Sequence, residues 1–169
     1  PILDLPYPTS LPQVRHLLGV LNEFSMFIPG YAEIAEPLYD LTSKSPSRDY
    51  GHIEVLNAVD ALKRAVTEAP CLLPVDEEQP MRLEVDASGR AWAAVLLQRG
   101  PDALWHPCHY VSKLFNPAQR KYSATDRELV GVVSAARALA KYVQNNPNCV
   151  VVNDHKAVSA LMKRNPIEL

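Results

Sequence analysis

Apolar residues in the first part of the chain recur every three or four positions, the spacing of helices with one buried face. The first stripe comprises Val14, Leu17, Leu18 and Leu21. Ser10 is placed to cap this helix and Pro29-Gly30 to end it. Two further helices are expected over residues 32–42 and 54–68. The pattern therefore predicts a helical extension that covers residues 1–70.

After residue 70 the pattern changes to short apolar or alternating runs that are separated by turn-forming residues. Strands are expected over residues 81–86, 92–98, 105–112 and 149–153, with a helix over 118–144 and a last helix from about His155. This order predicts an α+β domain over residues 71–169, in which helices cover a mixed sheet that begins with an antiparallel meander. Trp92 and Trp105 occupy strand positions, and we expect both in the core.

The overall charge of the chain argues against a global attraction to nucleic acid. The formal net charge is −2, the pI is about 6.2, and 47% hydrophobic residues describe an ordinary globular protein. Any contact with a polyanion must therefore come from a local patch. The best local cluster of basic and aromatic side chains is Arg120, Lys121 and Tyr122, for which a solvated surface is the equally weighted alternative.

The cysteines and the hydropathy indicate an intracellular protein, cytoplasmic or nuclear. Cys71, Cys108 and Cys149 are odd in number and widely spaced, which favours reduced thiols and matches no zinc site. No signal peptide or membrane-spanning run is present. The abrupt ends of the chain suggest a piece of a larger polyprotein or host protein. Because a sheet without its last elements exposes an apolar face, self-association is a further possibility.

Three carboxylates stand where the predicted elements could bring them together. Asp86 and Asp154 each end a predicted strand, where a side chain emerges at the edge of the sheet, and Glu128 lies near the start of the long helix. Their mutual repulsion would be costly unless divalent cations occupied the pocket. The arrangement is typical of a two-metal site that cleaves phosphodiesters.

Each of these carboxylates also has an ordinary structural interpretation. Asp86 begins an Asp-Ala-Ser-Gly turn, Glu128 is favoured near a helix start by the helix dipole, and Asp154 could cap the helix that follows it. Asp126, two residues before Glu128, is an alternative acid that faces another side of the helix.

Five segments, in order along nearly the whole chain, resemble the end of the polymerase and the ribonuclease H region of gypsy-type retrotransposon and retroviral reverse transcriptases. They are residues 18–42 (LGVLNEFSMFIPGYAEIAEPLYDLT), 84–88 (EVDAS), 106–113 (HPCHYVSK), 122–130 (YSATDRELV) and 152–157 (VNDHKA). The resemblance implies a ribonuclease H-like fold, with Asp86, Glu128 and Asp154 as ligands of two Mg²⁺ or Mn²⁺ ions. It also implies that the substrate is the RNA strand of an RNA–DNA hybrid, recognised by backbone shape and the 2′-hydroxyl.

Several polar residues near these acids are candidates for contact with nucleic acid. They are Ser88, Arg120, Lys121, Tyr122, His155 and Lys156. Ser88 could orient a substrate phosphate, although turn formation explains it equally well. His155 and Lys156 lie beside the expected pocket, and a solvated helix start is their ordinary interpretation.

The chain also departs from the family pattern. The family carries a fourth acid on a helix after a fifth strand, and this chain stops soon after Asp154. Asp49-Tyr-Gly-His52 stands where an aromatic–Trp pair is usual. We therefore expect a degenerate or incomplete domain that keeps the fold and weak binding of metal and nucleic acid, and a host-domesticated copy is one candidate for its parent. An active RNase H endonuclease and a non-catalytic connection-type module, which would lack the acids, are the alternatives.

Overall fold

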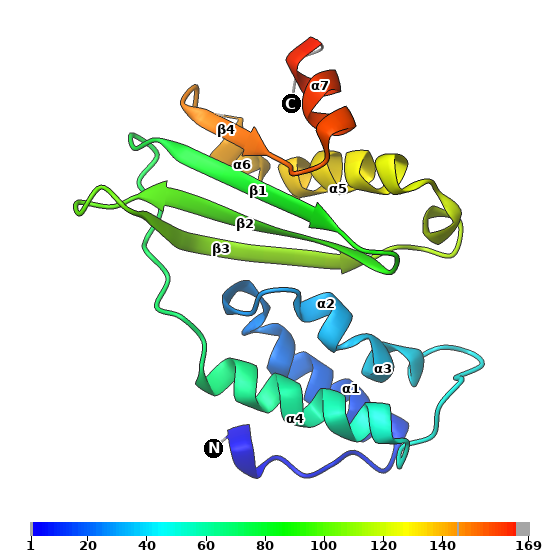
Figure 1. Cartoon of the computed structure of the whole chain (residues 1–169). Coiled ribbons are helices and arrows are strands. Elements are labelled where there is room, and N and C mark those ends of the chain that lie inside the picture. Colours follow the sequence, from blue (N-terminus) through cyan, green and yellow to red (C-terminus); the bar gives the residue numbers. More distant parts are fainter. Residues whose placement is uncertain (1, 145, 165–169) are drawn as a thin grey trace.

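The computed structural model describes residues 2–144 and 146–164, with side chains up to residue 160. A layer of helices lies beside β3, the edge strand of a four-stranded sheet, and further helices cover one face of that sheet (Figure 1). The helical layer comprises η1 (Ile2–Asp4), α1 (Leu11–Asn22), η2 (Ser25–Phe27), α2 (Tyr31–Ile34), α3 (Glu36–Asp40) and α4 (Ile53–Thr67).

The helical layer has a hydrophobic core of its own. Its fully buried residues include Val14, Leu21, Leu38, Val55, Val59 and Leu62. Ser10 stands at the N-cap of α1 as expected, but its side chain makes no capping hydrogen bond. The side chain of Gln13 instead accepts from the backbone N–H of Thr9 at 2.8 Å. The contact between Thr9 and Gln13 therefore fixes the start of α1.

The single helix expected over residues 32–42 is wrong in one respect, because it is broken into α2 and α3 at Ala35. Pro37 explains the break. It has no N–H to donate to the carbonyl group of Glu33, and its ring would collide with that carbonyl in a continuous helix. The chain therefore turns at Ala35 and starts a new helix with Pro37 in its first turn.

The sheet contains all four expected strands in the order β3-β2-β1-β4. They are β1 (Met81–Ala87), β2 (Ala91–Arg99), β3 (Trp105–Leu114) and β4 (Cys149–Val152). The first three form the antiparallel meander, whereas β4 lies parallel to β1 with Glu84 opposite Val152. A parallel neighbour requires a crossover, which the helices between β3 and β4 supply. The sheet is therefore mixed, as the sequence predicts.

The helix expected over residues 118–144 consists of three pieces. They are η3 (Gln119–Lys121), α5 (Ala124–Ala138) and α6 (Ala140–Val143), and α7 (Lys156–Arg164) follows β4. The expectation of one continuous helix is wrong because Ser123 has extended backbone and caps α5 through its hydroxyl, which accepts from the N–H of Asp126. At the other end Leu139 leaves helical geometry while its side chain stays buried at 2% exposure.

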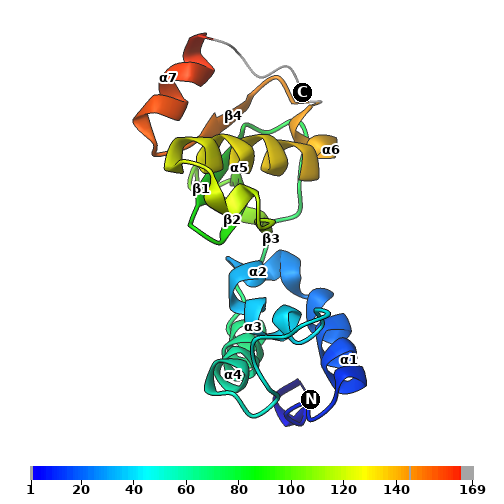
Figure 2. The ribbon, with the colours of Figure 1, turned by 90° about the vertical axis from the view of Figure 1, so that its right-hand side faces the viewer.

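Helix α5 packs closely against the sheet at Gly131. A Cβ atom at this position would lie 3.2 Å from Cβ of Trp92 and 3.6 Å from Cβ of Ala87. Figure 2 shows α5 lying across the face of the sheet. Gly131 thus sets the distance between α5 and β1, the two elements that carry Glu128 and Asp86.

Matched substitutions of two helical glycines should have opposite effects on stability. Gly19 in α1 has no atom within 4 Å of a built Cβ, so Gly19→Ala should raise the free energy of unfolding by about 0.5–1 kcal/mol through helix propensity. Gly131→Val should lower it by about 1–3 kcal/mol, because the added branch overpacks the contact with Trp92. Urea denaturation of both variants measures the effect, and a Gly131→Val protein as stable as the parent would contradict this packing.

One of the two tryptophans is not in the core. Trp92 is buried at 4% exposure, as expected, but Trp105 is 40% exposed at the beginning of the edge strand β3. The guanidinium group of Arg82 lies 5.7 Å from the centre of the Trp105 ring. The expectation for Trp105 is therefore wrong, because Trp105 begins the strand that lies at the edge of the sheet.

Within the described residues, none of the helices combines the length and the hydropathy needed to span a membrane.

Candidate metal centre

Three elements bring Asp86, Glu128 and Asp154 to one point. Asp86 is near the end of β1, Glu128 lies on α5, and Asp154 follows the end of β4. One carboxylate oxygen from each residue lies within 4.8 Å of the other two. Asp86 and Asp154 are exposed, whereas Glu128 is buried at 7% exposure. The three acids converge because β4 pairs parallel to β1 and because α5 packs closely against the sheet at Gly131.

Asp126, the alternative acid on the same helix, has a different role. Its Oδ2 accepts a hydrogen bond of 2.7 Å from the hydroxyl of Ser123, and its backbone N–H donates to that hydroxyl. The hydroxyl of Ser123 thus caps the first turn of α5, and the Asp126 carboxylate accepts the proton of that same hydroxyl. Asp126 therefore fixes the start of α5, and Glu128 is the acid that turns toward the sheet.

Asn153 holds Glu128 in place, and sequence reasoning missed it. Its Nδ2 donates to Oε2 of Glu128 at 2.8 Å and to the carbonyl oxygen of Val85 at 3.0 Å. Asn153 is itself buried at 7% exposure. One amide thus joins the end of β4 to β1 and to α5, and it orients the only buried acid of the cluster among the described residues. Its only signal in the sequence is its position between a strand and Asp154.

The segment after β4 is held by Asn153 as well. Its Oδ1 accepts from the backbone N–H of His155 at 3.0 Å, and its carbonyl oxygen accepts from the hydroxyl of Ser159 at 2.8 Å. The backbone of α7 begins at Lys156, so His155, and not Asp154, is the residue immediately before this helix. Asp154 is left with its carboxylate exposed beside Asp86.

The turn after β1 engages the hydroxyl of Ser88. This hydroxyl accepts from the backbone N–H groups of Arg90 and Ala91 at 3.1 Å and lies 3.2 Å from Oε1 of Glu33 in α2. Turn formation therefore accounts for Ser88, and its contact with a substrate phosphate stays a prediction. The contact with Glu33 also joins the helical layer to the end of β1 that carries Asp86.

The remaining candidate residues lie around this end of the sheet. Arg120, Lys121 and Tyr122 are all exposed on and just after η3. Nε of Arg120 donates to the carbonyl oxygen of Phe115, which leaves the rest of its guanidinium group at the surface. Nε2 of His155 lies 3.5 Å from the hydroxyl of Thr125, and Lys156 is exposed. Arg120 and Lys121 thus lie exposed shortly before α5, and Lys156 lies exposed two residues after Asp154, and the function of all three stays a prediction.

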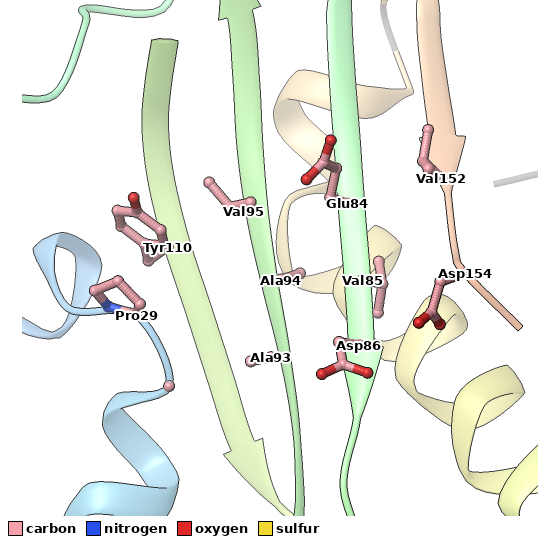
Figure 3. A pocket seen from close by; sticks show the side chains of 11 residues that line it. Pro29, Glu84, Val85, Asp86, Ala93, Ala94, Val95, Tyr110, Val152 and Asp154 are labelled. Atoms are coloured by element: carbon pink, nitrogen blue, oxygen red, sulfur yellow. The ribbon is translucent and has the colours of Figure 1, made fainter. Parts of the chain in front are cut away.

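A cleft of about 420 Å³ lies on the face of the sheet opposite α5 and reaches the acids. Its lining consists of Pro29, Gly30, Glu84, Val85, Asp86, Ala93, Ala94, Val95, Tyr110, Val152 and Asp154. Figure 3 shows its two sides, with Pro29 and Tyr110 on one and Val152 and Asp154 on the other. Burial raises the pKa of the Tyr110 phenol, so this side chain remains a neutral hydrogen-bond donor at pH 7. The acids therefore open into a cleft with largely apolar walls.

The chemistry of the three side chains fits a hard divalent cation. Carboxylate oxygens are the preferred ligands of Mg²⁺ and Mn²⁺, and the described cluster contains no nitrogen or sulfur donor that would favour zinc or copper. Oxygens from three chain elements within 4.8 Å of one another can share one ion or bridge two. Without a cation the same geometry places three negative charges together at a cost in stability.

The order of the sheet, the crossing helix and the three acids define a ribonuclease H-like α+β protein. The chain belongs to the family described as the RNase H-like domain found in reverse transcriptase, whose model matches residues 54–151. Asp86 and Glu128 fall inside this match, and Asp154 lies just beyond its end.

The chain is similar to segments of much longer retrotransposon proteins. It is 32% identical over 155 residues to the retrovirus-related Pol polyprotein from transposon 297 of Drosophila melanogaster. The aligned region covers 92% of this chain and 14% of that protein. It is 26% identical over 156 residues to the transposon Tf2-3 polyprotein of Schizosaccharomyces pombe and spans 12% of it. The chain thus spans only about an eighth to a seventh of the length of these relatives.

Solved structures of a foamy viral enzyme share the fold. The protease-reverse transcriptase in its dRH form with double-stranded DNA matches 96% of this chain and 28% of its own length, at 22% identity and a TM-score of 0.80. The same enzyme with an RNA/DNA hybrid matches 99% of this chain and 22% of its own length, with a TM-score of 0.73. At this identity the likeness shows the fold alone.

Proposed function

We propose that this chain is a divalent-metal-dependent ribonuclease H domain, which cleaves the RNA strand of RNA–DNA hybrids. The convergence of Asp86, Glu128 and Asp154 within 4.8 Å is the observation that carries this proposal. A fold kept only for structural reasons would have no need to gather three negative charges at this cost. The geometry therefore favours an active site over the connection-type alternative, which lacks the acids.

The protein side chains divide the work of such a site. Glu128 is buried and fixed by Asn153, so it would serve as the rigid ligand, while the exposed Asp86 and Asp154 can share ions with a substrate phosphate. When two Mg²⁺ or Mn²⁺ ions are bound, they supply an activated water and stabilise the leaving 3′ oxygen. The hydrogen bonds of Asn153 and the close packing at Gly131 hold the three acids at fixed positions relative to one another.

The substrate is proposed from the family and from the surroundings of the acids. A foamy viral reverse transcriptase of the same fold is described in complex with an RNA/DNA hybrid. Arg120, Lys121 and Tyr122 lie exposed near the start of α5, where they could follow a backbone, and His155 and Lys156 flank Asp154. With a net charge of −2, binding should be modest and should weaken strongly with salt.

The organisation of the chain and its setting are proposed on similar grounds. Two separate hydrophobic clusters support a helical extension over residues 1–70 and a ribonuclease H-like domain over residues 71–169, of which 145 and 165–169 lie outside the described residues. The cysteines are free, and burial raises the pKa of Cys108 and Cys149, which suits a reducing intracellular setting. The remainder of a larger polyprotein is the expected partner, because the relatives are polyproteins.

A combined binding and cleavage experiment tests the function. The chain should bind Mg²⁺ and Mn²⁺ in a calorimetric titration and should cut an end-labelled RNA strand paired with DNA while leaving a DNA duplex intact. Asp86→Asn should show neither property. Metal binding without cleavage would instead favour the degenerate domain, and the absence of both would favour a structural module.

A further inference from the structure

The segment 116–122 joins β3 to α5 and carries the basic and aromatic cluster 120–122, which is proposed to contact the hybrid. The start of this segment is fixed to the sheet, because the backbone N–H of Phe115 donates to the carbonyl oxygen of Arg90 at 2.8 Å. Its helix η3 has only three residues, and Tyr122 directly after it has extended backbone. The end of the segment therefore needs an anchor of its own.

Arg127 anchors the end of this segment to the turn that follows β1. Its Nη1 donates to the carbonyl oxygen of Tyr122 at 2.6 Å, and its Nε donates to the carbonyl oxygen of Ser88 at 3.1 Å. Within the described part of the chain, no backbone N–H donates to either of these two oxygens. The guanidinium group of Arg127 therefore supplies the hydrogen bonds that regular secondary structure does not provide at Ser88 and Tyr122.

The two anchored positions belong to two different parts of the proposed site. Ser88 stands two residues after Asp86, in the turn between β1 and β2, and Tyr122 ends the basic and aromatic cluster. Arg127 itself precedes Glu128 on α5, and Figure 1 shows that α5 begins at the end of the sheet where β1 ends. One side chain thus connects the segment proposed to hold the hybrid with the elements that carry two of the proposed metal ligands.

The chemistry of arginine suits this connection. A guanidinium group is planar and always charged, and its N–H groups form a fork of fixed geometry. Hydrogen bonds from a charged donor are about twice as strong as those between neutral groups. Arg127 therefore holds the carbonyl groups of Ser88 and Tyr122 at a fixed distance from each other, which the compact ammonium group of a lysine on its flexible stem would not do.

We propose that Arg127 is a positioning residue, whose guanidinium group sets the position of the bound RNA–DNA hybrid relative to the metal ions. The cluster 120–122 would hold the phosphate backbone of the hybrid, and Arg127 would fix that cluster relative to Asp86 and Glu128. This inference rests on the proposed function, because it concerns the alignment of the substrate at that same site. A misplacement of about 1 Å can lower a reaction rate about 10²-fold, so this alignment should decide how fast and where the RNA is cut.

Cleavage of a short hybrid with end-labelled RNA in millimolar Mg²⁺ tests this proposal. Arg127→Ala should lower kcat by about tenfold to a hundredfold, while KM changes little because the cluster 120–122 keeps its charges. The cuts should also spread over neighbouring phosphates instead of falling at the positions that the parent chain prefers. Arg127→Lys should show the same spread, since it keeps the positive charge and loses the planar fork.

Arg137→Ala is the matched control. Arg137 is exposed in the last turn of α5, and within the described residues its side chain makes no hydrogen bond or ion pair. The substitution removes the same charge, and it should change neither kcat nor the positions of the cuts. Far-ultraviolet circular dichroism should show an intact fold for Arg127→Ala, because Phe115 still anchors the start of the segment.

The positions of the cuts separate alignment from stability. An Arg127→Ala protein that cuts where the parent cuts overturns this inference while the proposed function stands, whether or not kcat falls, because a loss of stability removes active protein without moving the cuts. If Arg127→Ala does not fold, the cut positions of Arg127→Lys decide by the same criterion. A parent chain that cleaves no hybrid overturns both this inference and the proposed function.

Discussion

Glu128→Gln should make the metal-free protein more stable and at the same time remove most of its response to magnesium. At 4.8 Å, two unit charges repel by about 1–3.5 kcal/mol for effective dielectric constants of about 80 down to 20. Glu128 faces two such neighbours, Asp86 and Asp154. Against this stands the weaker hydrogen bond that a neutral amide accepts from Asn153, a loss of about 1 kcal/mol. The stability gained by removing the repulsion should therefore exceed the stability lost with the weaker hydrogen bond.

The expected result is a rise of a few degrees in the melting temperature without metal, since about 1 kcal/mol corresponds to about 2–4 °C at this chain length. In millimolar Mg²⁺ the parent protein should gain stability through binding, and Glu128→Gln should gain almost none. Cleavage of the hybrid should fall by about 10²-fold or more, because a fixed ligand is lost. Thermal melting with and without Mg²⁺ and a single-turnover cleavage assay measure these effects.

Asp126→Asn is the matched control on the same helix. Its carboxylate accepts from Ser123 and is not part of the acid cluster, and an amide oxygen can accept the same bond. The metal-free stability should change by less than about 0.5 kcal/mol, and the magnesium response should stay intact. If Asp126→Asn removed the magnesium response and Glu128→Gln did not, the two acids would have to exchange roles.

The difference between Asp126 and Glu128 shows how far the sequence alone could lead. Both acids stand near the start of a helix, and the resemblance to reverse transcriptases selected Glu128. The pattern Ser123-x-x-Asp126 is itself a capping signature, which could have assigned Asp126 independently of the family. Asp86 and Asp154 were predictable from strand ends, because parallel neighbours bring such ends together.

Other features depend on contacts that local patterns do not contain. Trp105 was expected in the core on strand propensity, yet its exposure depends on the place of its strand at the edge of the sheet. The breaks at Ala35 and Ser123 follow from Pro37 and from a cap, so they could have been predicted from local chemistry. The role of Asn153 could not, because its partners Glu128 and Val85 are 25 and 68 positions away in the chain.

Asn153→Asp hardly changes the shape of the side chain, yet it should strongly destabilise the ribonuclease H-like part of the chain. It replaces an amide that donates to Glu128 and to the carbonyl oxygen of Val85 with a carboxylate that can donate to neither. Both Asn153 and Glu128 are 7% exposed, so two negative charges would meet with little screening by water. An unpaired buried charge of this kind costs about 3–5 kcal/mol, out of a total stability of about 5–15 kcal/mol.

The pH dependence separates this charge effect from the loss of hydrogen bonds. Asn153→Ala removes the same two donors without adding a charge and should cost about 1–3 kcal/mol at every pH. In Asn153→Asp the folded state disfavours the ionised pair, so it takes up a proton more readily than the unfolded state, and its stability falls as the pH rises. The deficit relative to Asn153→Ala should be large at pH 7 and should shrink toward pH 4.5.

Urea denaturation of the two variants at both pH values, with and without Mg²⁺, measures the difference directly. Millimolar Mg²⁺ should recover part of the Asn153→Asp deficit at pH 7, because a cation between Asp86, Glu128 and Asp154 would offset the added charge. It should recover little for Asn153→Ala, in which Glu128 has lost the group that orients it. Equal stability of the two variants at pH 7 would mean that residue 153 and Glu128 are not in contact in solution, and the buried ligand of the proposed metal site would then lack its support.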